Sequence, residues 1–292
     1  MKLNHNQAVA LMVVVALLWS TAGVVTRHLE FARSFEVTFW RSLFTAISLV
    51  ILLPLFQGRQ VFQQILQNGW SFWLSGVCWG IMFTSFMVAL TLTSVGNVLV
   101  TMSTGPLLTA LLAWVVIGHR IPVRTWLAIV VAGAGIVYMF SGQMSQTSWL
   151  GTMLALCVPA AAAINWTIAQ HATMRGQNID LVPAVLVGAT LSAAFTLPWA
   201  LPFQASNHDI ALLAGLGLTQ LAIPCALSVW CARVLKAPEV SLLALLEIIF
   251  GITLAWWGAQ EEPTASVLIG GTLVMGALLV NEWLAWRQRS HK

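Results

Sequence analysis

Residues 8–28 read AVALMVVVALLWSTAGVVTRH, a stretch without a charged residue before Arg27. A helix needs about 20 apolar residues to cross a hydrocarbon core of about 30 Å, so this stretch is long enough to span a bilayer. Nine further stretches of this kind follow, at residues 35–56, 70–93, 96–116, 124–141, 148–171, 182–201, 209–235, 238–258 and 264–286. With 59% hydrophobic and 8% charged residues, the chain differs in composition from soluble domains. We therefore expect an all-α integral membrane protein with ten transmembrane helices.

The connections between these stretches are short and turn-like, as at residues 118–122 and 141–143, and leave no room for a second domain. Gly and Pro interrupt runs of Ala, Leu and Val. This pattern suits helices better than the strict alternation of an outer-membrane barrel. Lys2 precedes the first stretch and no small-residue cleavage site is evident, so we expect an uncleaved first helix.

Lysine and arginine residues are distributed unevenly between the two sides of the predicted bundle. Cytoplasmic loops carry an excess of these residues. With the N-terminus inside, Arg27 and Arg33 lie outside, and ten cations lie inside: Lys2, Arg59, Arg120, Arg124, Arg175, Arg233, Lys236, Arg287, Arg289 and Lys292. Both termini are therefore predicted to be cytoplasmic, in a bacterial-type inner membrane. The cations are spread over separate segments, so we expect no nucleic-acid partner.

The sequence lacks the motifs of several large enzyme classes. It contains no HExxH, Walker A, GxGxxG or GxSxG motif. The four cysteines lie within predicted helices and form no CxxC pair, and we interpret them as packing residues. We therefore expect no enzymatic activity, no metal site and no cofactor.

An internal repeat relates the two halves of the chain. Leu112-Ala113-Trp114 recurs as Leu254-Ala255-Trp256, about half a chain length later, and a short charged turn and a Gly-rich helix follow each copy. Five predicted helices separate the copies, and because five is an odd number, the second half enters the membrane in the opposite orientation. We thus predict two inverted five-helix repeats, residues 1–141 and 148–292. This is the architecture of secondary transporters, with a substrate site near the midplane between the halves.

Several motifs resemble those of the EamA family in the drug/metabolite transporter superfamily. The resemblance covers nearly the whole chain and rests on ALLWSTAG at residues 16–23, FWRS at 39–42, GPLLTALLAW at 105–114 and LEI at 246–248. The chain departs from the family pattern at Gly105, His119 and Ile248, where the family has Ser, Glu and Pro. The resemblance implies a ten-helix bundle of two inverted halves that transports small organic metabolites and often exports them. It implies no particular solute.

Two charged residues lie inside the apolar stretches and need a reason to be there. Glu247 lies near the middle of its stretch, where an ionised carboxylate costs about 2.5 to 3.5 kcal/mol on insertion scales. We interpret it as a proton-coupling site or as the partner of a substrate ammonium group; the alternative is a neutral or paired carboxyl group that serves helix packing. Arg41 either anchors or pairs helices near the outer interface, or contacts a substrate carboxylate or an outer gate.

Polar and aromatic residues complete the expected substrate site. Thr101 and Thr104 share one helix face with Asn97, and Asn165 should point into the bundle; these groups serve either interhelical hydrogen bonds or the substrate. Tryptophans away from the span ends are candidates for a cavity wall, with ordinary packing as the alternative. The expected substrate-binding residues are Trp19, Ser20, Arg41, Trp79, Phe83, Thr101, Thr104, Asn165, Trp166, Trp230 and Glu247.

Taken together, these features predict a secondary active transporter that exports small organic metabolites such as amino acids by alternating access. Proton coupling is the hypothesis attached to Glu247. The alternatives are a channel or facilitator for a small solute, and a membrane scaffold without transport. The expected partners are a small-molecule substrate and the lipid bilayer, and the expected assembly is a monomer or a homodimer.

Overall fold

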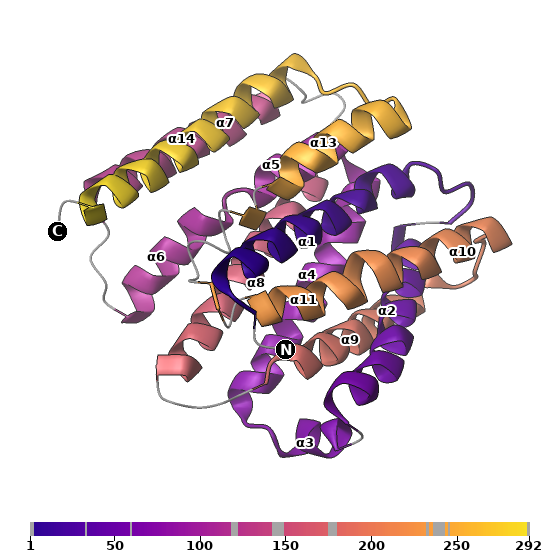
Figure 1. Ribbon diagram of the computed structural model, residues 1–292. Coiled ribbons are helices and arrows are strands. Elements are labelled where there is room, and N and C mark those ends of the chain that lie inside the picture. The colour runs from indigo at the N-terminus through magenta and orange to yellow at the C-terminus, as the bar shows by residue number, and fades with distance from the viewer. Residues whose placement is uncertain are drawn as a thin grey trace.

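Every element in the described part of the chain is a helix, which confirms the all-α prediction (Figure 1). The computed structural model describes residues 3–32, 34–58, 60–117, 122–141, 149–174, 180–231, 234–235, 243–244 and 246–290. The helices are α1 (His5–Thr26), α2 (Ser34–Gln57), α3 (Val61–Gln67), α4 (Trp70–Leu92), α5 (Val95–Met102), α6 (Gly105–Ile117), α7 (Val123–Ser141), α8 (Trp149–Met174), α9 (Val182–Ala200), α10 (Asn207–Leu216), η1 (Gly217–Ala222), α11 (Ile223–Cys231), α13 (Leu246–Ala259) and α14 (Ala265–Ser290).

Several helices have the length and composition that a bilayer requires. Six described segments are long and apolar enough to cross a membrane: His5–Thr26, Ser34–Gln57, Trp70–Leu92, Trp149–Ile168, Val182–Ala200 and Asn207–Cys231. Shorter apolar helices lie at Val123–Gly135, Leu246–Ala259 and Ala265–Asn281. These are the properties of a multi-pass membrane protein, and the count of ten transmembrane helices stays a prediction.

Part of the sequence behind the predicted orientation lies outside the described residues. This holds for Lys2, Arg33, Arg59, Arg120, Arg175, Arg233, Lys236 and Lys292, and also for His119. The cytoplasmic placement of both termini therefore stays a prediction.

The single helix predicted at residues 96–116 is divided into α5 and α6. A turn at Ser103 and Thr104 separates the two. The Thr104 carbonyl accepts the first hydrogen bonds of α6, from the N–H groups of residues 107 and 108, at 3.0 Å each. Pro106 follows this turn and has no N–H with which to continue the hydrogen bonding of α5. The short helix α3 was not predicted; it lies between the second and third predicted spans.

The two halves of the chain pack against each other through several helix pairs. α2 packs against α9, and α7 lies alongside α14 at the edge of the bundle (Figure 1). α1 packs against α11 and α13, while α8 packs against α4, α5 and α6. If the second half repeats the first, α8 matches α1, α11 matches α4, and α13 matches α5 and α6. These contacts are therefore of the kind that a repeat predicts, and the inversion itself stays a prediction.

Carboxylates tie the loops together where α1 ends, a part of the bundle that we call the Arg27 end. Asp209 accepts three backbone N–H groups of residues 30–32, at 2.8–3.0 Å. Glu36 accepts the backbone N–H groups of residues 204–205, at 2.8–3.0 Å. Each of these contacts joins the first half of the chain to the second.

An ion pair closes the same end on the other side of α1. Arg27 Nε lies 2.6 Å from Glu261 Oε2, and the guanidinium also donates to the carbonyls of Leu90 and Thr93, at 3.0 Å each. The second carboxylate oxygen of Glu261 accepts the Val95 N–H at 2.7 Å. The ends of α1 and α4 and the start of α5 are thereby bound to the loop between α13 and α14.

Candidate functional site

A cavity of about 190 Å³ lies between the two halves, with walls from α1, α2, α4, α5, α6, α8, η1, α11 and α13. Its lining is mainly apolar, with a few polar side chains, which is the usual make-up of a small-molecule site. Met12, Thr109 and Trp166 extend the wall away from the Arg27 end, because they lie in the parts of α1, α6 and α8 remote from it. The polar side chains of the wall are Arg41, Ser103, Thr109, Gln220, Cys225 and Glu247.

Arg41 is fully buried in α2 and holds a fixed position in this wall. One terminal nitrogen donates to Gln220 Oε1 at 3.1 Å, and the other donates to the Phe83 carbonyl at 2.8 Å. The guanidinium carbon lies 5.7 Å from the centre of the Phe86 ring, within range of a cation–π interaction. Arg41 Nε is buried and has no hydrogen-bond acceptor among the described residues.

A π-helical turn brings Gln220 to Arg41. In η1 the N–H of Ile223 donates to the Leu218 carbonyl, five residues earlier, and Pro224, which has no N–H, follows directly. At the start of η1, Gly217 packs so tightly on α2 that an added Cβ would lie 2.9 Å from the Arg41 carbonyl oxygen. Such turns are frequent at functional sites. The chain therefore uses an irregular helix to place one amide beside one guanidinium.

Glu247 lies in the first turn of α13, on the same cavity. Its side chain is partly buried. In the part of the chain that the structure describes, no hydrogen bond or ion pair holds its carboxyl group. Arg41, Cys225 and Glu247 all line this cavity. Glu247 therefore contributes to the cavity wall a carboxyl group that no described residue engages.

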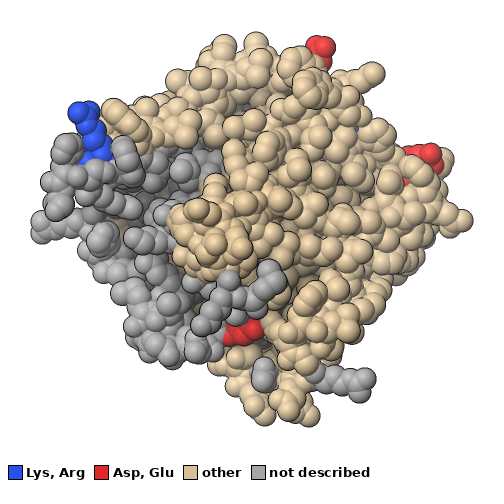
Figure 2. All heavy atoms as spheres, in the orientation of Figure 1, with Lys and Arg blue, Asp and Glu red and all other residues tan. Residues whose placement is uncertain are grey.

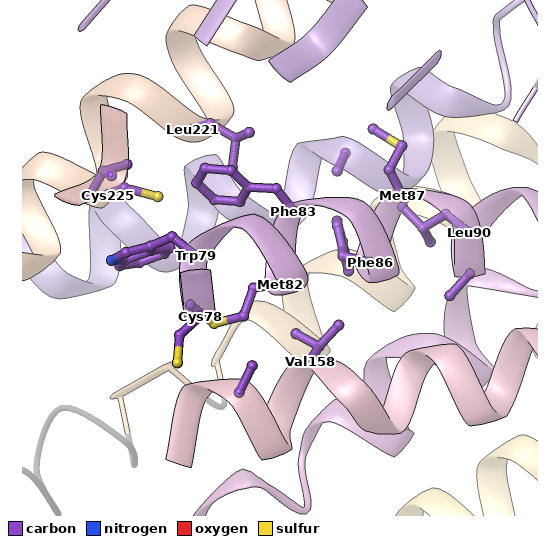
Figure 3. Packing of buried hydrophobic residues seen from close by; sticks show 14 of the residues in the cluster. Cys78, Trp79, Met82, Phe83, Phe86, Met87, Leu90, Val158, Leu221 and Cys225 are labelled. Atoms are coloured by element: carbon purple, nitrogen blue, oxygen red, sulfur yellow. The ribbon is translucent and has the colours of Figure 1, made fainter. Parts of the chain in front are cut away.

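Aromatic rings form much of the remaining wall. The Trp79 and Phe83 rings on α4 have centroids 5.5 Å apart and are tilted by 44°, and Figure 3 shows Phe83 beside Leu221 and Trp79 near Cys225. Trp79 Nε1 is buried without an acceptor among the described residues. These rings present both a stacking surface and an N–H donor.

The structure places six of the predicted substrate-binding residues together on the cavity: Trp19, Arg41, Trp79, Phe83, Trp166 and Glu247. The other five do not line it. Ser20, Thr101 and Thr104 donate to backbone carbonyls one helical turn earlier, at 2.7–2.8 Å. Their hydroxyl groups thus complete hydrogen bonds within their own segments.

Asn165 and Trp230 are also engaged elsewhere. Asn165 Oδ1 accepts the Ser75 hydroxyl at 2.6 Å, which joins α8 to α4. Trp230 packs edge to face on Phe56, with ring centroids 6.0 Å apart. A direct substrate contact for either residue stays a prediction.

Gln220 is the main residue that the sequence-based prediction missed. The available signal was a polar amide within an apolar span, four residues before Pro224. Polar residues in membrane helices commonly mark functional sites. Cys225, which the sequence analysis interprets as a packing residue, also lines the cavity.

Comparisons with known proteins agree on the class of molecule. The sequence profile described as the EamA-like transporter family matches residues 6–141 and 149–282. An uncharacterized transporter of Archaeoglobus fulgidus is 24% identical over 174 residues, which are 60% of this chain and 61% of that protein. A solved crystal structure of another protein matches 97% of this chain and 99% of its own, with a TM-score of 0.65 and 18% sequence identity. The last similarity concerns the fold alone.

Proposed function

The chain belongs to the EamA-like transporter family, and we therefore propose that it is a secondary active transporter that exports small organic metabolites such as amino acids. The membrane would be a bacterial-type inner membrane, with both termini in the cytoplasm. The protein is a multi-pass membrane transporter; the solute class, direction, orientation and mechanism are the proposal.

The observation that carries the proposal is the composition of the cavity wall. One guanidinium, Arg41, and one carboxyl group, Glu247, border a small space lined by Trp19, Trp79 and Trp166. A metabolite that has both an ammonium group and an apolar side chain is complementary to Glu247 and to the rings. At about 190 Å³, the cavity is smaller than the 300–1,000 Å³ or so of drug-sized pockets, which favours a small metabolite.

Alternating access is supported by the asymmetry of the bundle. The Arg27 end is tied across the two halves by Asp209, Glu36 and Glu261, while the cavity extends toward the opposite end. With the predicted orientation, the Arg27 end is the outer end. This conformation would then receive a solute from the cytoplasm.

Proton coupling is proposed at Glu247. A carboxyl group that binds either a proton or a substrate ammonium group exchanges one for the other, which links the two fluxes. Among the described residues, Arg41 and Cys225 are the other titratable groups on this cavity. The proposed assembly is a monomer or a homodimer.

Flux in proteoliposomes tests the proposed function. Purified protein reconstituted with radiolabelled amino acids should give saturable uptake, counterflow, and stimulation by an imposed pH gradient. Counterflow distinguishes a carrier from a channel, because it requires a binding site that is exposed alternately to the two sides of the membrane. A scaffold would give no flux with any solute, and that result would contradict the proposal.

A further inference from the structure

Arg41 carries a positive charge for which the described part of the chain supplies no negative partner. Its side chain is fully buried. Its terminal nitrogens donate to two neutral oxygens, of Gln220 and Phe83, and its Nε has no acceptor among the described residues. A buried charge without a counter-charge is strongly destabilising unless a ligand or an ion supplies one. An anion bound beside Arg41 in the cavity would therefore neutralise this buried charge.

Gln220 helps to fix the orientation of the Arg41 guanidinium. Its Nε2 donates to the Trp19 carbonyl at 3.4 Å, and this contact directs its Oε1 toward Arg41. With the Phe83 carbonyl on the other terminal nitrogen, the guanidinium is held from two helices. Gln220 is thus a positioning residue, which acts on a ligand through Arg41.

A carboxylate has the geometry that Arg41 can accept. Guanidinium groups bind carboxylates through two parallel N–H donors, and Nε is one donor of such a pair. Resting on the proposed function, we propose that Arg41, positioned by Gln220, binds the carboxylate group of the transported metabolite.

Glu247 does not compete for Arg41 in this conformation. Both side chains belong to described residues and line the same cavity, and they form no ion pair with each other. Glu247 therefore leaves the charge of Arg41 without a counter-charge, and both groups lie on the wall of the cavity that would hold the ligand.

Paired ligands test the assignment by isothermal titration of the purified full-length protein. L-phenylalanine and L-phenylalaninamide differ in the carboxylate, and both retain the ammonium group and the ring. The unsubstituted protein should bind phenylalanine at least tenfold more tightly than the amide. Arg41→Gln should bind the two equally. Arg287→Gln is the matched control, because Arg287 is exposed and does not line the cavity, and it should keep the preference.

Gln220→Glu tests the same assignment with Arg41 retained. A carboxylate on residue 220, where the present oxygen lies 3.1 Å from Arg41, would supply the missing charge from within the protein. We expect the thermal unfolding midpoint to be kept or raised while phenylalanine affinity falls at least tenfold. Damage to packing would lower both.

The proposal is overturned if the unsubstituted protein fails to bind phenylalanine, binds the amide equally well, or keeps its preference in Arg41→Gln. It is equally overturned if Gln220→Glu folds and binds phenylalanine normally. Counterflow with a panel of amines and neutral solutes separates this failure from failure of the proposed function. A carrier of solutes without a carboxylate would show counterflow, whereas a protein that does not transport would show none.

Discussion

Glu247 is the residue at which we expect protonation to couple to transport. It lies on the cavity wall, and no described residue pairs with it. Glu247→Gln keeps the shape of the side chain and removes both its charge and its proton. We expect this variant to lose the stimulation of flux by a pH gradient, whereas counterflow, which needs no net driving force, continues. The measurement is proteoliposome flux with and without an imposed gradient.

Glu262→Gln is the control for that experiment, because Glu262 is exposed and does not line the cavity. If Glu247→Gln retains gradient-driven flux with an unchanged pH profile, Glu247 has a structural role. Coupling would then have to be sought elsewhere or assigned to the membrane potential.

The tryptophan rings of the cavity wall should contribute to the apparent affinity for the substrate. Trp19→Ala and Trp79→Ala each remove a ring from the cavity. An aromatic contact contributes about 0.5–1.5 kcal/mol, so each variant should raise the apparent KM of transport about two- to tenfold. Trp257→Ala is the control, because Trp257 is 79% exposed. Normal kinetics in both cavity variants, with expression intact, would remove the rings from the proposed site.

The sequence predicts a site residue best where its side chain is charged, because burying a charge costs free energy. Arg41 and Glu247 stand out because a charge in an apolar span needs a special environment. Thr101 and Thr104 have the spacing of a cavity-facing stripe, yet their hydroxyls bond to carbonyls one turn earlier. Spacing along a helix cannot distinguish these outcomes, because either one satisfies a hydroxyl group. Gln220 depends on a π-turn that the sequence pattern does not show.

At the scale of elements, the contact between η1 and α2 places Gln220 and is open to a direct test. An Ala side chain at Gly217 would bring its Cβ within 2.8 Å of Phe44 Cβ and Thr45 N, and 2.9 Å from the Arg41 oxygen. Overpacking of this kind costs about 1–3 kcal/mol. We expect Gly217→Ala to lower the thermal unfolding midpoint in detergent and to reduce flux.

Gly215→Ala is a closely matched control, since nothing lies within 4 Å of the added Cβ. Ala has a helix propensity higher than Gly by about 0.8–1.0 kcal/mol, so this variant should be as stable as the unsubstituted protein or slightly more stable. Equal behaviour of the two Ala variants would show that the close approach of η1 to α2 is not needed.

Apolar runs of span length predicted the positions of most helices well, because the bilayer sets both their length and their composition. Breaks within a run were harder to predict. Pro106 follows the break between α5 and α6, whereas Pro159 lies inside the uninterrupted α8. The consequence of a proline depends on whether neighbouring helices satisfy the freed backbone groups, and that information belongs to the tertiary structure.

For the whole molecule, the orientation in the membrane follows from the distribution of cations. Ten inside cations against two outside predict that both termini are cytoplasmic. Reporter fusions placed after Lys292 and within residues 141–148 should therefore report opposite sides of the membrane. A C-terminus found outside would overturn the orientation and with it the assignment of the Arg27 end as the outer end.

Few described residues on the face of the molecule shown in Figure 2 are charged. The ion pair at the Arg27 end joins the two halves of the chain. Arg27 and Glu261 belong to different halves, and their side chains are only 29% and 22% exposed. Movement of the halves that opens the cavity to the outside would have to separate them. The ion pair should therefore favour the conformation that is closed at this end.

Cys225 offers a reporter for that opening, because its side chain lines the cavity. In a background with Cys78, Cys157 and Cys231 replaced by Ser, which leaves Cys225 as the only cysteine, a membrane-impermeant thiol reagent added from the outside should label Cys225 slowly. Arg27→Glu places two carboxylates together and should accelerate labelling severalfold, since like charges repel at this distance. The double variant Arg27→Glu/Glu261→Arg restores an opposite-charge pair and should return labelling toward the original rate. Slow labelling in Arg27→Glu would mean that other contacts at this end, such as those of Asp209 and Glu36, hold it closed and that the ion pair contributes little. Fast labelling in the double variant would mean that the contacts of Arg27 with the Leu90 and Thr93 carbonyls, which the swap does not restore, matter more than the ion pair.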